Sequence, residues 1–154
     1  MLFVPAAVVT GIGSLPLMSM SSAIRSDAES SPEVPFWPQL PRLSERESVI
    51  GQGLGIAAAS SRNEGYGYQV KEGRIDSVLE ILHRSNGELT PANAAGFGAF
   101  EEALSSGVFS FAVAVKGQIE GPITLSAYLF HHGRPFLSDP VLFAAIAFHV
   151  SQII

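Results

Sequence analysis

A chain of 154 residues, 47% of them hydrophobic and only 15% charged, is long and apolar enough to bury the core of one domain. Its net charge of −5, with nine scattered Lys and Arg residues, excludes the clustered basic surface that nucleic-acid binding needs. Because the sequence has no cysteine, disulfides and thiolate chemistry are excluded from these residues.

The first predicted element is a strand over residues 3–9, an apolar run that ends before Gly11. The same run could be read as a signal peptide, but no basic side chain precedes Arg25, so we interpret it as a buried strand. The sequence has no uninterrupted run of about 18 apolar residues, so we expect no membrane-spanning helix and no membrane partner. A cytoplasmic location follows as the default expectation.

The next segments alternate between helical and extended patterns. Residues 17–31 predict a weak helix that Pro32 ends, and residues 34–41 predict a short extended run that three prolines interrupt. A Ser-x-x-Glu capping box at Ser44 predicts a helix that continues through Gln52.

Glycine, serine and asparagine then predict a loop excursion over residues 53–73, with room for a hairpin around Tyr66 and Tyr68. Apolar residues spaced three and four apart predict an amphipathic helix over 75–82. Thr90, followed by a proline, predicts the N-cap of another helix. Its expected apolar stripe comprises Phe97, Phe100, Ala103 and Leu104.

The clearest strand pattern covers residues 108–122, where large apolar side chains alternate with small ones. Pro122 then begins a helix, residues 131–140 form a turn-rich loop, and Asp139 caps a last helix that runs to the C-terminus. Strands that alternate with helices predict an α/β fold with a parallel sheet and right-handed crossovers.

Three segments carry a family resemblance: "TGIGSLP" (10–16), "PEVPFWPQLPR" (32–42) and "VKGQIEGPITL" (115–125). In this order and spacing they resemble the superfamily shared by cobalamin-independent methionine synthase and uroporphyrinogen decarboxylase, and most closely its small methionine-synthase-like members. The resemblance implies a (β/α)8 TIM barrel, which typically needs about 250 residues. Residues 1–154 would then form the N-terminal portion of a single barrel domain, a partial barrel of three to four βα units.

The resemblance also implies a parent activity, methyl transfer to a small thiol substrate. In methionine synthases an Ile-Gly-Ser after the first strand holds the amino-acid end of homocysteine, and the matching residues are Ile12, Gly13 and Ser14. The alternative is a strand-to-helix turn that merely needs glycine. Leu43 stands where the family has the carboxylate that binds the homocysteine ammonium, and an isobutyl side chain cannot bind it.

The zinc ligands of the family lie on later strands and have no counterpart here, so we expect no cofactor in this chain and zinc only with a C-terminal half. The chain would then be truncated and inactive alone. A decarboxylase-like member of the same superfamily is one alternative. A second is a non-catalytic binding or assembly module, in which an exposed sheet edge and the apolar residues 141–154 pair two copies as a homo-oligomer.

Four further residues are candidate substrate contacts at the mouth of the expected barrel. Gln118 and Glu120 end the clearest strand on one face, and Trp37 and Gln39 share a strand-like period. An ordinary polar strand end and a core tryptophan are the competing interpretations. The adjacent pair His131 and His132 lacks a nearby third ligand, so we predict no metal site.

Overall fold

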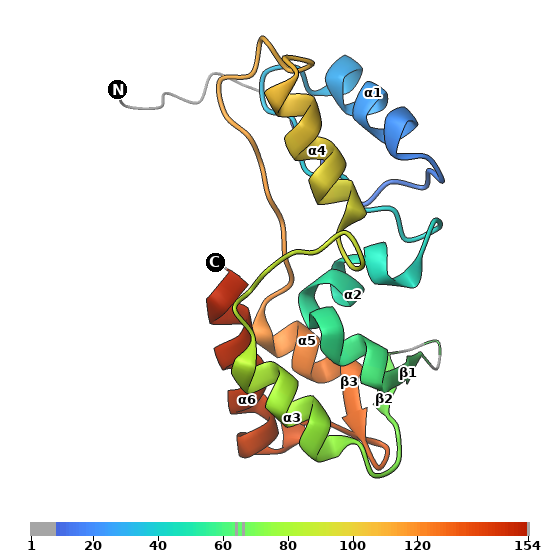
Figure 1. The fold of residues 1–154 in the computed structure, drawn as a ribbon, viewed down its shortest axis with the longest axis vertical. Coiled ribbons are helices and arrows are strands. Elements are labelled where there is room, and N and C mark those ends of the chain that lie inside the picture. Colours follow the sequence, from blue (N-terminus) through green and yellow to red (C-terminus); the bar gives the residue numbers. More distant parts are fainter. Residues whose placement is uncertain (1–8, 64, 66, 154) are drawn as a thin grey trace.

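The computed structural model describes residues 9–63, 65 and 67–153. The molecule is elongated, with two groups of elements stacked along its long axis (Figure 1). Helices α1 and α4 form one end, α3, α5, α6 and a small sheet form the other, and α2 lies between them. In chain order the elements are α1 (Met20–Ser30), η1 (Glu45–Glu47), α2 (Val49–Leu54), η2 (Gly55–Ser60), β1 (Ser61–Asn63), β2 (Tyr68–Val70), α3 (Ile75–Arg84), α4 (Ala95–Ser105), α5 (Pro122–Tyr128), β3 (Leu129–His131), β4 (Arg134–Pro135), η3 (Phe136–Ser138) and α6 (Pro140–Ile153), where η denotes a 3-10 helix.

The sheet has the order β1-β2-β3-β4 and is mostly antiparallel. Strands β1 and β2 pair antiparallel, as do β3 and β4, and only β2 and β3 run parallel. The predicted partial (β/α)8 barrel is therefore wrong, since the strands do not form a repeated parallel βα arrangement. The three motif segments pair with one another only through two isolated parallel bridges, Ser14 with Gln39 and Phe36 with Lys116.

The predicted strand over residues 108–122 is also wrong. Residues 107–111 form turns, and the segment makes a single bridge at Lys116. Alternation of apolar residues predicts a strand only when one face becomes buried, and here Phe111 is 79% exposed, with Val113 and Val115 exposed beside it. The predicted strand over residues 3–9 lies outside the described residues except for Val9.

Four helices predicted from local signals are confirmed: α1, α3, α5 and α6. Helix α5 begins at Pro122 as expected. At the start of α6 the side-chain oxygen Oδ1 of Asp139 accepts hydrogen bonds from the amides of Val141 (2.9 Å) and Leu142 (3.2 Å), so the predicted cap is confirmed too. None of the helices within the described ranges has the length and apolar character that a bilayer crossing requires.

Residues 53–73 contain more regular structure than the expected loop excursion. They hold the end of α2, all of η2, and the antiparallel pair of β1 and β2, in which Asn63 lies opposite Tyr68. Tyr66, the other residue of the expected hairpin, lies outside the described residues. Leu54 and Val70 from this segment are core residues.

Two predicted helices differ from the structure. Ser44 caps a helix as expected, since its hydroxyl accepts from the amide of Arg46 (3.3 Å), but that helix is only η1, and α2 begins separately behind its own cap, Ser48. The helix expected from Thr90 begins only at Ala95. Both the amide and the hydroxyl of Thr90 donate to Oδ1 of Asn93, at 2.9 and 2.8 Å, so a turn occupies the expected N-cap. The acceptor that begins α4 is instead the side chain of Glu47, described below.

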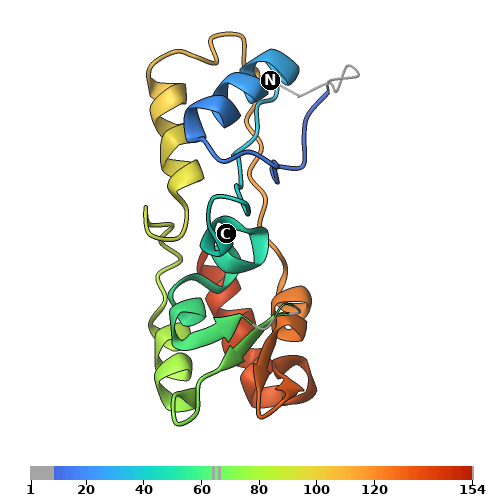
Figure 2. The ribbon, with the colours of Figure 1, turned by 90° about the vertical axis from the view of Figure 1, so that its right-hand side faces the viewer.

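The apolar core consists of two clusters, one at each end of the molecule. The upper cluster packs Trp37, Phe100, Ala103 and Phe109 between α1 and α4, and Phe97 and Leu104 lie against it, so the predicted stripe of α4 is confirmed. The lower cluster lies between the sheet and helices α2, α3, α5 and α6, as Figure 2 shows from the side. Its buried members are Leu54, Ala57, Ala58, Tyr68, Val70, Val78, Leu82, Leu125, Leu129, Phe136, Ala145, Ile146 and Val150.

A buried carboxyl group ties α1 to the segment that follows it. Asp27 is fully buried, and its Oδ2 accepts a hydrogen bond from the amide of Phe36 (3.0 Å), while Oδ1 has no partner among the described residues. Burial raises the pKa of Asp27 from 3.8 to about 7, and the hydrogen bond from Phe36 opposes that rise. The proton is therefore held in the folded state at a pH at which the unfolded chain has lost it.

This raised pKa predicts the direction of a pH effect on stability. Between about pH 4 and pH 7 the folded state binds more protons at Asp27 than the unfolded state does, so the free energy of unfolding falls as pH rises. We expect Asp27→Asn, which keeps an acceptor for Phe36, to remove this fall and to be more stable than wild type at pH 8, on the order of 1–3 kcal/mol. Urea unfolding at several pH values measures it, with Glu29→Gln, an exposed carboxylate of α1, as control. An undiminished pH dependence in Asp27→Asn contradicts the assignment.

Candidate functional site

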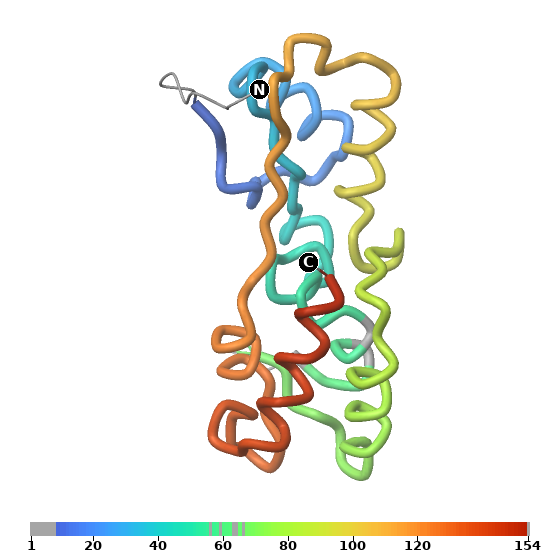
Figure 3. Tube along the Cα trace, turned by 90° about the vertical axis from the view of Figure 1, so that its left-hand side faces the viewer, coloured from blue at the N-terminus to red at the C-terminus, as the bar shows by residue number. Residues whose placement is uncertain are grey.

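The three motif segments lie side by side, although they form no ladder. The amide of Leu15 donates to the carbonyl of Gln39 (2.9 Å), and the amide of Gln39 donates to the carbonyl of Gly13 (2.8 Å). On the other side of the central segment, the amide of Trp37 donates to the carbonyl of Lys116 (3.0 Å). Figure 3 shows the third segment, in orange, running along the second, in cyan. The segments are parallel, so their carboxyl ends meet at one place.

Gln39 joins the segments through its side chain. It is fully buried, and its Nε2 donates to Oε1 of Gln52 in α2 (3.0 Å) and to the backbone carbonyl of Gln118 (3.1 Å). Its Oε1 is buried and accepts no hydrogen bond from the described residues. A buried acceptor without a donor costs roughly 1–3 kcal/mol, so this oxygen is the point where the network is incomplete.

Gly13 faces that oxygen. Its φ of +87° is one that residues with a side chain rarely adopt, and a Cβ placed there would lie 3.0 Å from the carbonyl oxygen of Trp37 and 3.6 Å from Oε1 of Gln39. The turn therefore needs glycine for its own geometry, which is the alternative interpretation of this motif. Ser14 is exposed, and the side chain of Ile12 is 71% exposed.

Glu47 continues the network from Gln52 into α4. Only 3% of Glu47 is exposed, and its Oε2 accepts from Nε2 of Gln52 (3.3 Å) and from the amide of Gly96 (3.2 Å). Its Oε1 accepts from the amide of Ala95 at 2.6 Å. A carboxylate at the positive end of a helix dipole binds amides that the helix itself leaves unpaired. Glu47 is thus the N-terminal cap of α4, 48 residues before it in the sequence.

The other predicted site residues fall into two groups. Gln118 and Glu120 are half-buried, and Gln118 contributes its backbone carbonyl to the network. Trp37 is buried in the upper cluster, where its ring lies 5.0 Å from that of Phe97 in an edge-on contact, as a core tryptophan would. The roles of these residues in substrate binding stay predictions.

Sequence reasoning missed Glu47, Gln52, Asn93 and His149, all of which are buried. A usable signal existed for Gln52 and His149, because a single polar side chain inside an otherwise apolar helix marks a buried hydrogen bond. The role of Glu47 could not be predicted in this way. Its position in a Ser-x-x-Glu box instead predicted a cap for the helix that begins at Ser44.

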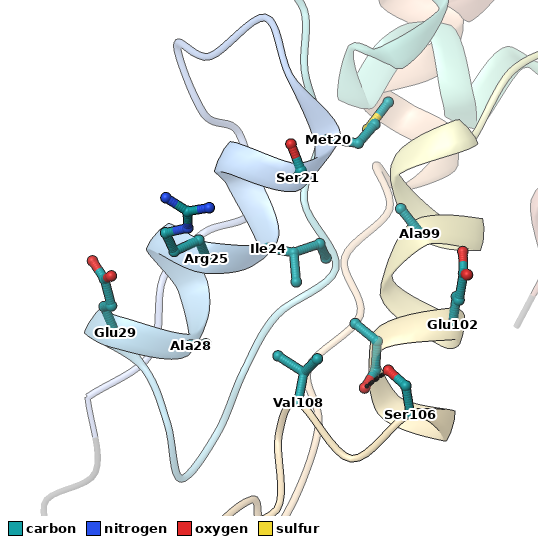
Figure 4. A pocket seen from close by; sticks show the side chains of 11 residues that line it. Met20, Ser21, Ile24, Arg25, Ala28, Glu29, Ala99, Glu102, Ser106 and Val108 are labelled. Carbon is teal, nitrogen blue, oxygen red and sulfur yellow. Dashed lines mark hydrogen bonds between the residues drawn. The ribbon is translucent and has the colours of Figure 1, made fainter.

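Among the cavities that the described residues line, three lie away from the motif segments. Figure 4 shows one of about 700 Å³ between α1 and α4, where Ile24, Ala28 and Val108 line the floor and Glu102 lies on α4. A second, of about 380 Å³, lies between α3 and the segment 85–93, with His149 as the lining residue from α6. A third, of about 100 Å³, lies beside His131.

The rings of His131 and His132 contact each other at an interplanar angle of 40°. The ring centroids of His131 and His132 are 4.1 Å apart, and burial, with a smaller contribution from His132, lowers the pKa of His131. In the part of the chain that the structure describes, no three His, Asp or Glu side chains come together as a metal site would require.

The carboxylate of Glu47 should stabilise the folded state more than an exposed carboxylate does. Glu47→Ala leaves the amides of Ala95 and Gly96 and the side chain of Gln52 without their acceptor, and we expect it to lower the free energy of unfolding by about 2–3 kcal/mol. Denaturant unfolding followed by circular dichroism measures this loss. Glu101→Ala, an exposed glutamate within α4, is the matched control and should change stability little. Equal losses in both variants contradict the capping role.

Comparison of the chain with protein-family models, with curated proteins and with solved structures finds no match. The resemblance to the methionine-synthase superfamily therefore stays an expectation that depends on the three motif segments alone.

Proposed function

We propose that this chain provides the substrate-binding residues of an enzyme that transfers a methyl group to a small thiol. The observation that carries the proposal is the meeting of Gly13, Gln39 and Gln118 at the carboxyl ends of three parallel segments, where the side-chain oxygen of Gln39 has no donor among the described residues. The proposal does not depend on a barrel. It needs only that these ends form one polar surface.

The chemistry of this surface suits the polar end of a small ligand. Ser14 is exposed, and its hydroxyl can donate or accept a hydrogen bond. Leu43, 44% exposed, offers no charge for an ammonium group, so we propose a thiol without an amino group in preference to homocysteine. In this proposal the zinc that activates the thiol is held by residues from outside this chain, and the chain alone binds without turnover.

Ser14 tests the proposal because it can be changed without touching the core. We expect 3-mercaptopropionate to bind the purified chain and to bind Ser14→Ala at least about tenfold more weakly, since one hydrogen bond to a charged group is lost. Calorimetric titration measures both affinities, with L-homocysteine as the competing ligand. Ser110→Ala, another exposed serine, is the control. Absence of binding, or equal affinity in wild type and Ser14→Ala, contradicts the proposal.

A second candidate function is assembly of two copies of the chain. The observation that favours it is the exposed apolar face of Phe111, Val113 and Val115, next to a backbone whose Val115 amide donates to none of the described residues. Val141 and Phe148 on α6 are exposed as well. Exposed apolar side chains beside a backbone amide without a partner among the described residues are a surface on which a second copy can pair.

The assembly function predicts the effect of one charge. Val113→Asp places a carboxylate in the middle of the proposed contact, so we expect wild type to be a dimer and Val113→Asp to be a monomer. Light scattering after size-exclusion chromatography measures the mass of each. Val141→Asp on α6 distinguishes the two apolar surfaces, because it leaves the dimer intact if only the segment near Val113 pairs. A monomeric wild type at every concentration contradicts this function.

A further inference from the structure

The segment that follows α3 contains an asparagine directly before a glycine, Asn86 and Gly87. Residues 85–90 form no helix or strand, and Asn86 is exposed, whereas Asn93 in the turn that follows is buried. Figure 1 shows this segment, in yellow-green, beside the end of α6. None of the residues of the proposed thiol site lies in it, so its chemistry is independent of that site.

The backbone nitrogen of Gly87 can react with the side chain of Asn86. It is one peptide unit from the side-chain carbonyl carbon, so the two can close a five-membered ring without a second molecule. Gly87 has no Cβ to hinder the approach, and its φ of +72° is one that other residues rarely adopt. Its amide donates to the hydroxyl of Ser85 (3.2 Å) and not to the carbonyl of a helix or strand, so no regular structure fixes this nitrogen.

Glu88 contacts both polar atoms of the Asn86 side chain. Oδ1 of Asn86 accepts from the backbone amide of Glu88 (3.2 Å), and Nδ2 donates to Oε2 of the Glu88 carboxylate (3.3 Å). When a nucleophile adds to the side-chain carbonyl, negative charge develops on Oδ1, and the departing Nδ2 gains positive charge as it takes up a proton. The amide of Glu88 stabilises the first charge and its carboxylate stabilises the second.

We propose that Asn86 is a modification site, at which asparagine converts spontaneously to isoaspartate with the assistance of Glu88. The nitrogen of Gly87 forms a bond to Cγ of Asn86, the bond from Cγ to Nδ2 breaks, and the amide proton of Gly87 leaves with Nδ2 as ammonia. Water then opens the cyclic imide. Its attack at Cγ gives aspartate, and its attack at the main-chain carbonyl carbon gives isoaspartate, whose backbone runs through Cβ and Cγ and is one carbon longer.

The longer backbone does not fit between this segment and α6. A Cβ on Gly87 would overlap the carbonyl oxygen of Gln152 and would lie 2.6 Å from the backbone nitrogen of Ile153, so the two backbones leave no room for a further carbon. The new carboxylate also replaces a donor to Glu88 with an acceptor, and two like charges repel. Conversion therefore weakens the contact between residues 85–88 and the last turn of α6.

Incubation of the purified chain at neutral and at mildly alkaline pH tests the site. Mass spectrometry of proteolytic peptides, with enzymatic methylation of isoaspartate as a second measurement, should find the product at Asn86 at least about tenfold faster than at Asn93. Asn93 is the internal control, because it is buried and the amide that would attack it, that of Ala94, donates to the carbonyl of Thr90 (2.7 Å). Absence of the product at Asn86, or equal rates at both residues, overturns the proposal.

Glu88→Gln separates the effect of the structure from that of the local sequence. It keeps the backbone amide and removes the carboxylate, so we expect conversion at Asn86 to slow by about two- to fivefold. Glu80→Gln makes the same change of charge on a carboxylate that contacts Arg84 instead, and it should leave the rate unchanged. Equal rates in these two variants overturn the role of Glu88.

Asn86→Asp separates the two consequences of conversion, because it carries the new charge without the additional backbone carbon. We expect converted wild-type protein to unfold at a lower urea concentration than freshly purified Asn86→Asp. Asn86→Gln, incubated in the same way, should keep its original midpoint. If converted wild type and Asn86→Asp unfold at the same concentration, the proposed effect on α6 is overturned.

Discussion

The contact between the carboxylate of Glu47 and the first amides of α4 is the constraint on which the arrangement depends. Helix α4 has no side-chain cap within its own neighbourhood, so its start is set by a residue that precedes it by 48 positions. From Glu47 the hydrogen bonds pass through Gln52 to Gln39, and from there to the backbone at Gln118. This chain of buried polar groups crosses the molecule between its two apolar clusters, where side-chain packing alone would leave several relative positions open.

The helices that were predictable from the sequence are those whose signals are local. Helix α3 has its own apolar period, α5 its own proline at the first turn, and α6 its own aspartate cap. The start of α4 could not be predicted, because the acceptor comes from Glu47 while Thr90 is occupied by Asn93. Hydrogen bonds between residues far apart in the sequence leave no periodic pattern by which to find them.

The predicted strand over residues 108–122 is wrong for a different physical reason. Alternating apolar residues specify a buried face only if some surface is present to cover it, and in this molecule Phe111 and Val113 meet solvent instead. Part of the candidate site was predictable, since the order of the three motifs brings Gly13, Gln39 and Gln118 together. The partners of Gln39 and the cavity at His149 were not, because each is assembled from segments more than ten residues apart.

Trp37, the one tryptophan of the sequence, lies in the upper cluster, whereas Tyr68 lies in the lower one. Indole fluorescence thus reports on the packing around α1 and α4, and the tyrosine signal contains the contribution of the sheet. If the hydrogen bonds of Glu47, Gln52 and Gln39 couple the two ends, the tryptophan and tyrosine emissions change at the same denaturant concentration, as in a two-state transition. Separate midpoints would identify two cooperative units within this single polypeptide, each with a stability of its own.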